Sequence, residues 1–530
     1  MTERHAQVLV IGAGAAGAAA SWKLATAGID VCCLEQGGWV RPAEYVTTRP
    51  DWEVRRQLDW NPNPNVRRRP TDYPISDDTS PIKPLLFNGV GGSTVMWSAH
   101  TPRFHPSDFR VRAADGVADD WPITYSDLEP FYDENDRMMG IAGIAGDPAN
   151  PPRSPRQTPP VPLGPGGHRL AEAFDRLGWH WWPSDVAINT QPYGDERGAC
   201  NNCGPCELGC VHRAKAEVSV TYWPAALAAG AELRTDARVQ RVLLGRDGRA
   251  RGARYLDVDG VEHEVTADAV LICANGIGTP RLLLMSADGD HPEGIANSSG
   301  LVGRRLMLHP IAFAIGVFPE QMFGHRGITA CSILSQEFYE TDQDRGFVRG
   351  YEMQVTRSHG PLMTALGGFG FDMPWGRGHH QRFDDVFDHT VGIAVTSEDL
   401  PDPENRVELD HDQRDGHGLP AARMVYRVDD NARAALDHGL ARSSEALREA
   451  GASEVIQAPL MPAAGFHLMG TARMGDDPAT SVVDRWGRCH DVDNLFIADG
   501  SVFVTAAAVN PTPTLQALAL RTADHLTASL

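Results

Sequence analysis

The stretch Val8-Leu-Val-Ile-Gly-Ala-Gly-Ala-Ala-Gly17 decides the fold class of this chain. Its four leading apolar residues predict a short buried strand, and the alanine-rich run that follows predicts a helix. A second apolar strand, from Ile29 to Leu34, ends at an acidic residue. Glycines between a strand and a helix, with an acid after the next strand, are typical of a βαβ unit that holds the pyrophosphate and ribose of a dinucleotide. The residues expected to contact that dinucleotide are Gly12, Gly14, Ala15, Ala16, Gly17 and Glu35. A glycine-rich turn is the alternative, and the motif does not separate FAD from NAD.

A second glycine-rich stretch runs from Asn88 to Trp97 and reads Asn-Gly-Val-Gly-Gly-Ser-Thr-Val-Met-Trp. Its composition alone is also compatible with a flexible loop.

The segment from Phe466 to Thr514 carries three further marks. His467 heads a His-Leu-Met-Gly-Thr run, Asp499-Gly500 follows, and Asn510 begins an Asn-Pro-Thr-Pro run. Threonine followed by proline predicts a helix that begins at Pro513, with Thr512 as its cap. The start of such a helix offers unpaired N–H groups and a positive dipole end to an anionic group. Each mark alone is weak, because histidines before Gly-Thr are more often ordinary partly buried side chains and Asn-Pro is more often a turn.

Together these marks resemble the glucose-methanol-choline oxidoreductases, flavoenzymes that oxidise alcohols. The resemblance implies FAD in the βαβ unit, His467 as the catalytic base and Asn510 as its partner beside the flavin. It also implies that the second glycine-rich stretch runs along the pyrophosphate and past the flavin ring, and that Val239 lies where backbone groups hold the adenine. The expected cofactor contacts outside the first unit are Gly91, Gly92, Ser93, Thr94, Met96, Trp97, Val239, Asp499, Gly500, Asn510 and Thr512.

Residue 96 bears on how the flavin is held. Some sugar-oxidising relatives in this family tether the flavin through a histidine just before the tryptophan of the second glycine-rich stretch. Met96 occupies that position here. A thioether cannot form the histidyl bond, so we expect FAD to be bound without a covalent link there.

The run from Trp121 to Phe131 resembles the sugar-oxidising branch of the family, closest in look to bacterial pyranose oxidases and glycoside 3-oxidases. We therefore expect oxidation of a secondary alcohol of a sugar or glycoside to a ketone, with O2, a quinone or a dye-like acceptor reoxidising the flavin. An iron–sulfur-containing sugar dehydrogenase that passes electrons to a cytochrome or quinone is the alternative, and steroid or long-chain alcohol oxidation fits less well. A non-catalytic electron-transfer flavoprotein would need no base beside its flavin, so His467 and Asn510 favour an enzyme.

Four cysteines are clustered at Cys200, Cys203, Cys206 and Cys210. Their spacing matches the runs that bind iron–sulfur clusters in bacterial ferredoxins, except that Val211 stands where proline usually follows. A structural loop of thiols and a cluster both stay open, and zinc is less favoured because its four ligands rarely lie so close in sequence. Since no partner run occurs elsewhere in the chain, we expect no metal that catalysis requires.

Composition narrows the possible partners. The chain has 48 basic and 69 acidic residues, a net charge of −21, which disfavours nucleic acid and anionic membrane surfaces. No apolar run reaches the length of a bilayer span. Because the N-terminal Met-Thr-Glu-Arg-His leads almost directly into the first strand, we expect no secretory signal. We expect a cytoplasmic protein with no membrane or nucleic-acid partner.

The length of 530 residues allows two domains, possibly interleaved. Because nucleotide-binding marks lie at both chain ends, we expect an FAD-binding domain from residues 1–115, 220–300 and 460–530, and a substrate domain from 116–219 and 301–459. Apolar patterns predict strands at 311–318, 350–357, 390–396 and 405–409 in an antiparallel sheet over the flavin. The expected fold class is α/β, a Rossmann-like FAD-binding domain interleaved with a substrate domain built on an antiparallel sheet with helices.

Overall fold

The N-terminal unit forms the predicted strand, helix and strand. The computed structural model describes residues 4–328, 331–357 and 360–530, so residues 1–3 of the N-terminal stretch lie outside the described part. Strand β1 (Arg4–Ile11), helix α1 (Ala15–Thr26) and strand β2 (Val31–Leu34) follow one another, and the strands pair in parallel. Gly12 turns the chain into α1 with φ +103°, and a Cβ there would lie 2.4 Å from the carbonyl oxygen of Cys273. Only glycine meets both requirements.

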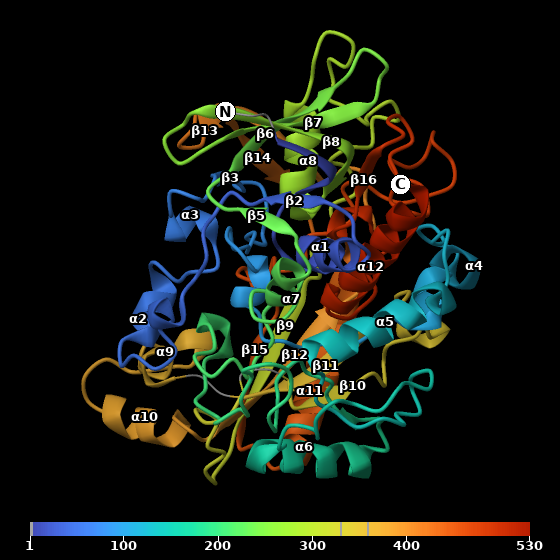
Figure 1. Cartoon of the computed structure of the whole chain (residues 1–530). Coiled ribbons are helices and arrows are strands. Elements are labelled where there is room, and N and C mark those ends of the chain that lie inside the picture. The colour runs from blue at the N-terminus through green and yellow to red at the C-terminus, as the bar shows by residue number, and fades with distance from the viewer. Residues whose placement is uncertain (1–3, 329–330, 358–359) are drawn as a thin grey trace.

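Strands from three separated parts of the chain form a seven-stranded sheet around this unit (Figure 1). The added strands are β5 (Glu232–Arg234), β6 (Arg238–Leu244), β7 (Ala250–Leu256), β8 (Glu262–Ile272) and β16 (Leu495–Ile497). Their order is β5-β2-β1-β8-β7-β6, and β16 pairs with the C-terminal part of β8. The start, middle and end of the chain thus meet in one sheet. The boundaries of the expected FAD-binding domain stay a prediction.

Helices pack on this sheet in a layer that joins both chain ends. Helix α1 contacts α7 (Tyr222–Ala228) and α12 (Thr512–Ser529), and α12 contacts α5 (Tyr125–Met139). Helix α8 (Asn275–Met285) contacts β6 instead. Helix α12 begins at Thr512, one residue before the predicted start, because Pro511 already has helical dihedral angles of φ −82° and ψ −9° and takes the position before the first turn.

A second, six-stranded sheet is antiparallel throughout, as predicted. Its order is β15-β9-β12-β11-β10-β4. The strands are β4 (Trp182–Pro183), β9 (Ile311–Val317), β10 (Ile333–Ser335), β11 (Tyr351–Thr356), β12 (Thr390–Ser397) and β15 (Glu454–Ala458). The fourth predicted strand, near 405–409, is β13 (Arg406–Arg414), but it belongs to a separate three-stranded sheet with β14 (Pro420–Val425) and β3 (Ile75–Ser76). An apolar pattern indicates a strand without indicating its partner.

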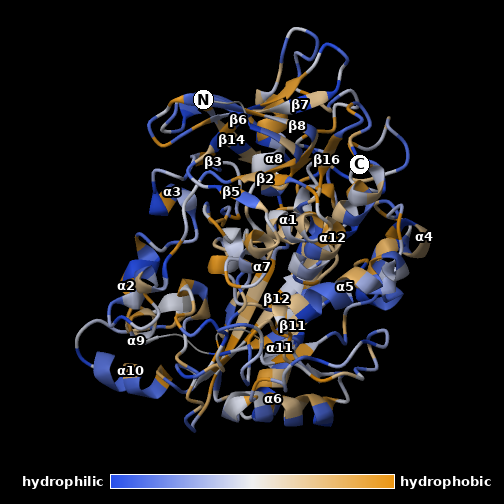
Figure 2. Ribbon diagram, in the orientation of Figure 1, coloured by the Kyte–Doolittle hydropathy of each residue, from blue (hydrophilic) through white to orange (hydrophobic). Residues whose placement is uncertain are grey.

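The two faces of the six-stranded sheet have different neighbours. Helix α11 (Asp430–Glu449) packs across β9, β11 and β12, and α6 (Gly164–Leu177) packs beside it. Met353 and Ile393 point into the apolar core under these helices. Since side chains alternate along a strand, their neighbours in sequence point to the opposite face. Figure 2 shows that the central strand β12 is largely hydrophobic.

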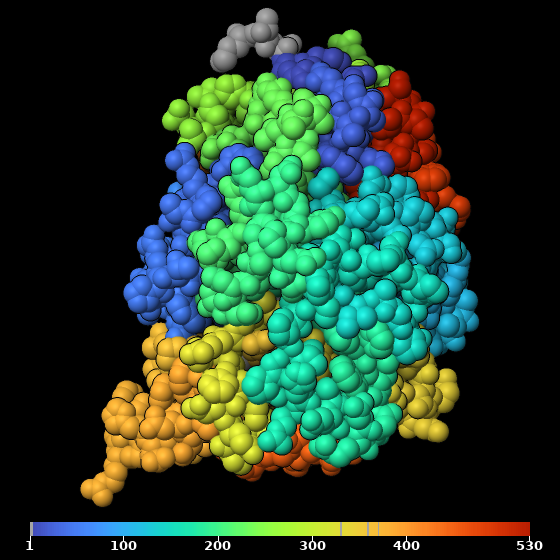
Figure 3. All heavy atoms as spheres, turned by 60° about the horizontal axis from the view of Figure 1, so that its bottom comes forward, coloured from blue at the N-terminus to red at the C-terminus, as the bar shows by residue number. Residues whose placement is uncertain are grey.

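The remaining helices are short. They are α2 (Trp52–Gln57), α3 (Pro64–Arg67), α4 (Val111–Asp115), α9 (Pro361–Ala365) and α10 (His379–Val386). The segment around α10 projects from the rest of the molecule (Figure 3). Within the described ranges, none of the helices combines the length and apolar character that a membrane span requires.

Candidate active site

A cavity of about 440 Å³ is walled by residues from both large sheets. Its volume falls within the roughly 300–1,000 Å³ that is usual for small-molecule and cofactor sites. Sixteen of the eighteen residues predicted for catalysis or cofactor contact line it: Gly12, Gly14, Ala15, Ala16, Glu35, Gly92, Ser93, Thr94, Met96, Trp97, Val239, His467, Asp499, Gly500, Asn510 and Thr512. The structure therefore brings residues from both ends of the chain to one site.

The other two predicted residues, Gly17 and Gly91, do not line the cavity but position residues that do. A Cβ on Gly17 would lie 1.9 Å from the carbonyl oxygen of Gly12, so this glycine lets α1 approach the turn. Gly91 has φ +101° and begins the turn that carries Gly92 and Ser93 to the cavity.

Two glycine-rich turns touch at the cavity wall. A Cβ on Gly92 would stand 2.7 Å from the Cα of Gly14. Gly14 also precedes the first residue of α1 and has no side chain with which to cap it. The first N–H groups of a helix lack partners within the helix and carry its positive dipole end. This wall is therefore narrow, uncharged and suited to a phosphate group.

Two buried carboxylates bind main-chain groups around the cavity. Glu35 accepts hydrogen bonds from the main-chain N–H groups of Ala13, at 2.8 Å, and Gly37, at 2.9 Å. Asp499 accepts from the Thr279 hydroxyl at 2.6 Å and from the main-chain N–H of Ser501 at 2.8 Å. Burial raises the pKa of both carboxyl groups. These contacts fix the turns after β2 and β16.

His467 and Asn510 face each other in the cavity wall. Asn510 Nδ2 lies 3.3 Å from His467 Nε2. Asn510 Oδ1 accepts a hydrogen bond from Gln354 Nε2 at 2.8 Å, and the same nitrogen of Gln354 donates to a carboxylate oxygen of Glu352. A carboxylate oxygen can only accept, so the group of Gln354 that faces Glu352 is its NH2 group. The same NH2 group faces Asn510, so the atom of Asn510 that faces Gln354 is its oxygen. Asn510 therefore presents its N–H to His467.

The imidazole of His467 is uncharged at neutral pH. Burial in the surrounding protein lowers its pKa well below the ordinary value, and the neighbouring His309 and His100 lower it further. A neutral imidazole has one nitrogen with a free lone pair, so it can accept a proton.

One face of the six-stranded sheet closes the cavity over this pair. Alternating positions of β9, β11 and β12 line it: Ile311, Phe313, Gln354, Thr356, Ala394 and Thr396. Half of these side chains are apolar and the polar three carry neutral hydrogen-bonding groups. The wall thus suits a small uncharged molecule with some hydroxyl groups.

Comparison with known proteins agrees with this geometry. Two models described as GMC oxidoreductase match residues 178–311 and 401–519, and a model of an NAD(P)-binding Rossmann-like domain matches residues 10–68. The chain is 45% identical to 2-methyl-1,2-propanediol dehydrogenase from Mycolicibacterium austroafricanum, over 98% of this chain and 94% of that protein. The chain is a GMC (glucose-methanol-choline) oxidoreductase.

Two further relatives cover nearly the whole GMC oxidoreductase. The fructose dehydrogenase large subunit from Gluconobacter japonicus is 32% identical over 98% of this chain and 97% of its own length. The 6'''-hydroxyparomomycin C oxidase from Streptomyces lividus is 32% identical over 99% of this chain and 93% of its own length. Among solved structures, pyridoxine 4-oxidase from Mesorbium loti has the same fold, with a TM-score of 0.65 and 17% identity over 98% of this chain and 99% of that one.

As a GMC oxidoreductase, the protein is an FAD-dependent enzyme that acts on CH–OH groups. The residues present fit the cofactor. The touching glycine turns leave room for a pyrophosphate beside the start of α1, and Glu35 lines the cavity where a ribose would follow. Met96 is buried in the wall and makes no histidyl group available for a tether.

Three polar residues of this GMC oxidoreductase were not identified from the sequence. His309 contacts His467, and Gln354 contacts Asn510. His100 lines the cavity and its Nδ1 bonds the Ser184 hydroxyl at 2.7 Å. Gln354 is the one that a pattern could have found, since the period of two along β11 places it on the same face as Thr356.

The cysteine loop of the GMC oxidoreductase adjoins the same cavity through Glu207 and Leu208. All four of its cysteines are among the described residues, and none of them forms a disulfide bond. Burial raises the pKa of the Cys200 and Cys203 thiols. Within the described ranges of the chain, no group of three or more His, Cys, Asp or Glu side chains is arranged to hold a metal ion.

Proposed function

We propose that this enzyme oxidises one hydroxyl group of a small molecule that carries two adjacent hydroxyl groups. The observation that carries the proposal is the hydrogen-bonded row Gln354–Asn510–His467, which lies beside the apolar side chains Ile311, Phe313 and Ala394 in the cavity wall. It offers one site for the reacting hydroxyl and a second acceptor beside it.

Oxidising an alcohol to a carbonyl removes two electrons and two hydrogens, one of them the hydroxyl proton. Bound FAD would supply the acceptor for the two electrons and the carbon-bound hydrogen, which leave together as a hydride. The hydroxyl proton needs a base, and His467 is the neutral imidazole at this end of the cavity. Its Nε2 lies on the Asn510 side, where the hydroxyl would donate its hydrogen bond.

Asn510 orients the reacting hydroxyl. Its Oδ1 is bound by Gln354, so its Nδ2 is the group that faces His467 and an incoming oxygen. An amide N–H donates to the alcohol oxygen while His467 accepts from the alcohol O–H. Holding the alcohol in this way contributes to the rate because it fixes the reacting hydroxyl next to the base.

Gln354 favours a substrate with a neighbouring hydroxyl. Its Nε2 donates to Glu352 and Asn510, which leaves its Oε1 as the group that it offers to the cavity. That oxygen accepts a hydrogen bond from a second hydroxyl. Ile311, Phe313 and Ala394 provide an apolar wall for the carbon skeleton. A small vicinal diol suits this combination, and the 45% identical relative is named for such a diol.

A secondary alcohol of a sugar or glycoside is the second candidate. Sugars also carry adjacent hydroxyls, and the relatives named as fructose dehydrogenase large subunit and 6'''-hydroxyparomomycin C oxidase support this class. Thr356 and Thr396 would bind its further hydroxyls. The electron acceptor is O2 or a quinone-like compound, since relatives are named both as oxidases and as dehydrogenases.

Anaerobic bleaching of the flavin tests the proposal. The holoenzyme is mixed with 2-methyl-1,2-propanediol, with 2-methylpropan-1-ol as its matched control lacking the second hydroxyl, and with fructose and methyl glucosides. We expect the diol or a sugar to bleach the flavin at least about tenfold faster than the monoalcohol. Equal rates for diol and monoalcohol would remove the role of Gln354, and no bleaching by any of these compounds would contradict the proposed substrate class. Adding O2 or a quinone afterwards identifies the acceptor.

A further inference from the structure

His309 stands directly behind His467, away from Asn510. The Nδ1 atoms of the two imidazoles lie 2.8 Å apart, and their rings are nearly perpendicular, at 85°. His309 is fully buried and has φ +56°, in the left-handed region that a histidine rarely adopts. A strained backbone that persists in a buried position is held by its surroundings.

The other nitrogen of His309 binds main-chain carbonyls. His309 Nε2 lies 2.5 Å from the carbonyl oxygen of Ala507 and 3.1 Å from that of Ala506. A carbonyl oxygen only accepts, so Nε2 of His309 carries a hydrogen. Burial lowers the pKa of His309 to about 4, which keeps its ring neutral at neutral pH. Its Nδ1 then has a free lone pair.

The hydrogen between the two rings therefore belongs to His467. A distance of 2.8 Å between the two Nδ1 atoms requires a hydrogen bond, so one of them must carry a hydrogen. The single ring hydrogen of neutral His309 is on Nε2. His467 Nδ1 thus donates to His309 Nδ1. A neutral His467 with a hydrogen on Nδ1 has none on Nε2, the nitrogen on the Asn510 side.

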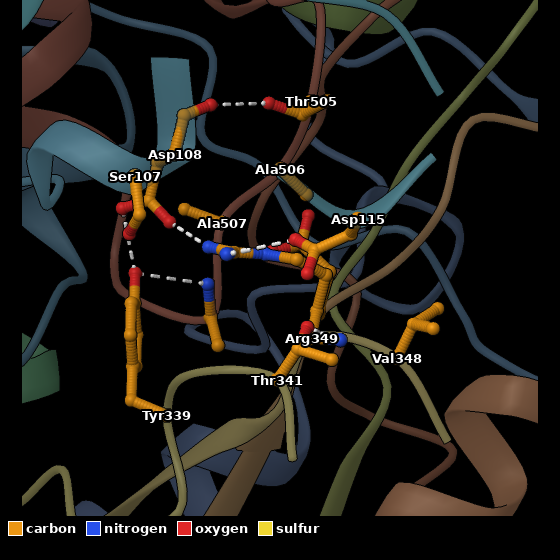
Figure 4. A network of polar contacts seen from close by, with 12 residues as sticks. Ser107, Asp108, Asp115, Tyr339, Thr341, Val348, Arg349, Thr505, Ala506 and Ala507 are labelled. Carbon is orange, nitrogen blue, oxygen red and sulfur yellow. Dashed lines mark hydrogen bonds and ion pairs between the residues drawn. The ribbon is translucent and has the colours of Figure 1, made fainter. Parts of the chain in front are cut away.

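The carbonyls that anchor His309 are themselves fixed by a buried polar network (Figure 4). The Thr505 hydroxyl donates to the main-chain oxygen of Asp108 at 3.1 Å, and Tyr339 donates to the Asp108 carboxylate at 2.8 Å. Arg349 forms an ion pair with the same carboxylate. Ala507 has φ +58°, so both ends of its contact with His309 lie in the left-handed region. The network holds the Thr505–Ala507 segment so that its carbonyls face His309.

We propose that His309 is a positioning residue that fixes His467 in the tautomer whose Nε2 is free to take the substrate proton. The proposal rests on the proposed role of His467 as base. Without His309, His467 Nδ1 loses its acceptor, and the imidazole can place its hydrogen on Nε2 instead. That form donates to the substrate oxygen and cannot accept its proton.

Nitrogen NMR of the resting holoenzyme tests the tautomer without turnover. Protein labelled with ¹⁵N only in histidine is compared with His467→Gln to assign the His467 signals. A nitrogen that bears a hydrogen and one that does not resonate far apart. We expect a hydrogen-bearing Nδ1 and a bare Nε2 for His467, and a shift towards the opposite tautomer in His309→Ala. A hydrogen on Nε2 in the unaltered enzyme would overturn the proposal.

Rates of flavin bleaching provide the second test. We expect His309→Ala to slow bleaching at saturating substrate by about 10 to 10² fold. The substrate concentration that gives half of the maximal rate should change little. His309→Asn should recover most of the rate, because asparagine keeps an acceptor near the Nδ1 position and tolerates a positive φ. Retained FAD and melting temperature exclude misfolding. Equal rates for the Asn and Ala variants would show that the acceptor does not matter.

The two proposals can fail separately. If no alcohol bleaches the flavin of the unaltered enzyme, the proposed substrate class is wrong, whereas the NMR measurement still reports which nitrogen of His467 bears the hydrogen.

Discussion

Gly92 and Gly14, from two distant turns, approach so closely that a Cβ on Gly92 would lie 2.7 Å from the Cα of Gly14. We therefore predict that Gly92→Ala separates the turns and lowers both FAD content and stability. The left-handed φ of +52° costs roughly 1–2 kcal/mol for alanine, and the forced displacement adds about 1–3 kcal/mol. Flavin absorbance per protein and the melting temperature of the holoenzyme measure these effects.

Gly248→Ala is the matched control for this prediction. Gly248 also has a positive φ, +77°, but a Cβ there meets nothing within 4 Å. It should lose only the conformational part of the stability and keep its FAD. Equal FAD loss in both variants would count against the contact between the turns.

Met96 leads to a prediction about flavin attachment. It lines the cavity where some relatives carry a tethering histidine, and its thioether cannot form that bond. Acid precipitation should therefore release the yellow flavin into the supernatant. Colour that stays in the pellet would indicate a covalent link elsewhere in the protein.

The cysteine loop should not be needed for substrate oxidation. We predict that the purified enzyme holds no iron in proportion to protein and that Cys203→Ser bleaches its flavin at the unaltered rate. Cys203 is the exposed member of the four thiols, so its replacement leaves the core intact. About three or four iron atoms per chain, with broad absorbance beyond the flavin bands, would show a cluster instead.

The sequence allowed the dinucleotide unit to be predicted because its requirements are local. Gly12, Gly17 and Glu35 are dictated by one turn, one helix contact and one strand end. The pairing of His467 with Asn510 came only through a family resemblance. His309 lies 158 residues from His467 along the chain, so no local pattern connects them. Its role depends on how β9 and the segment before α12 meet in the folded protein.

The same limit applies to the substrate wall. The alternation in β9, β11 and β12 predicted strands and two faces, but it did not specify which face lies over the cavity. Gln354 lies 156 residues from Asn510 in sequence, and only the packing of the six-stranded sheet brings their amides together. The predicted strand near 405–409 joined another sheet for the same reason.

Replacing His467, the proposed base, should affect catalysis without affecting folding. We predict that His467→Ala keeps its FAD and melting temperature while flavin bleaching by substrate slows by about 10² fold or more. Asn510→Ala should slow it less, since the role proposed for Asn510 is to orient the alcohol and not to take its proton. Anaerobic stopped-flow absorbance gives both rates. His411→Ala, an exposed histidine on β13, is the control and should leave the rate unchanged. A base is not needed at residue 467 if His467→Ala matches the unaltered enzyme.

The pH dependence of bleaching reports the protonation of His467. Burial, and then His309 and His100, hold its pKa well below the ordinary value of about 6.5. Below its folded-state pKa the imidazole is protonated and cannot act as a base, and above it the base is free. The bleaching rate at saturating substrate should therefore stay flat as the pH falls through about 6.5 and decline only under more acidic conditions. Stopped-flow measurements across this range, with FAD content checked at each pH, give the profile. A decline centred at or above about 6.5 would mean that the titrating base is not a buried imidazole with a lowered pKa.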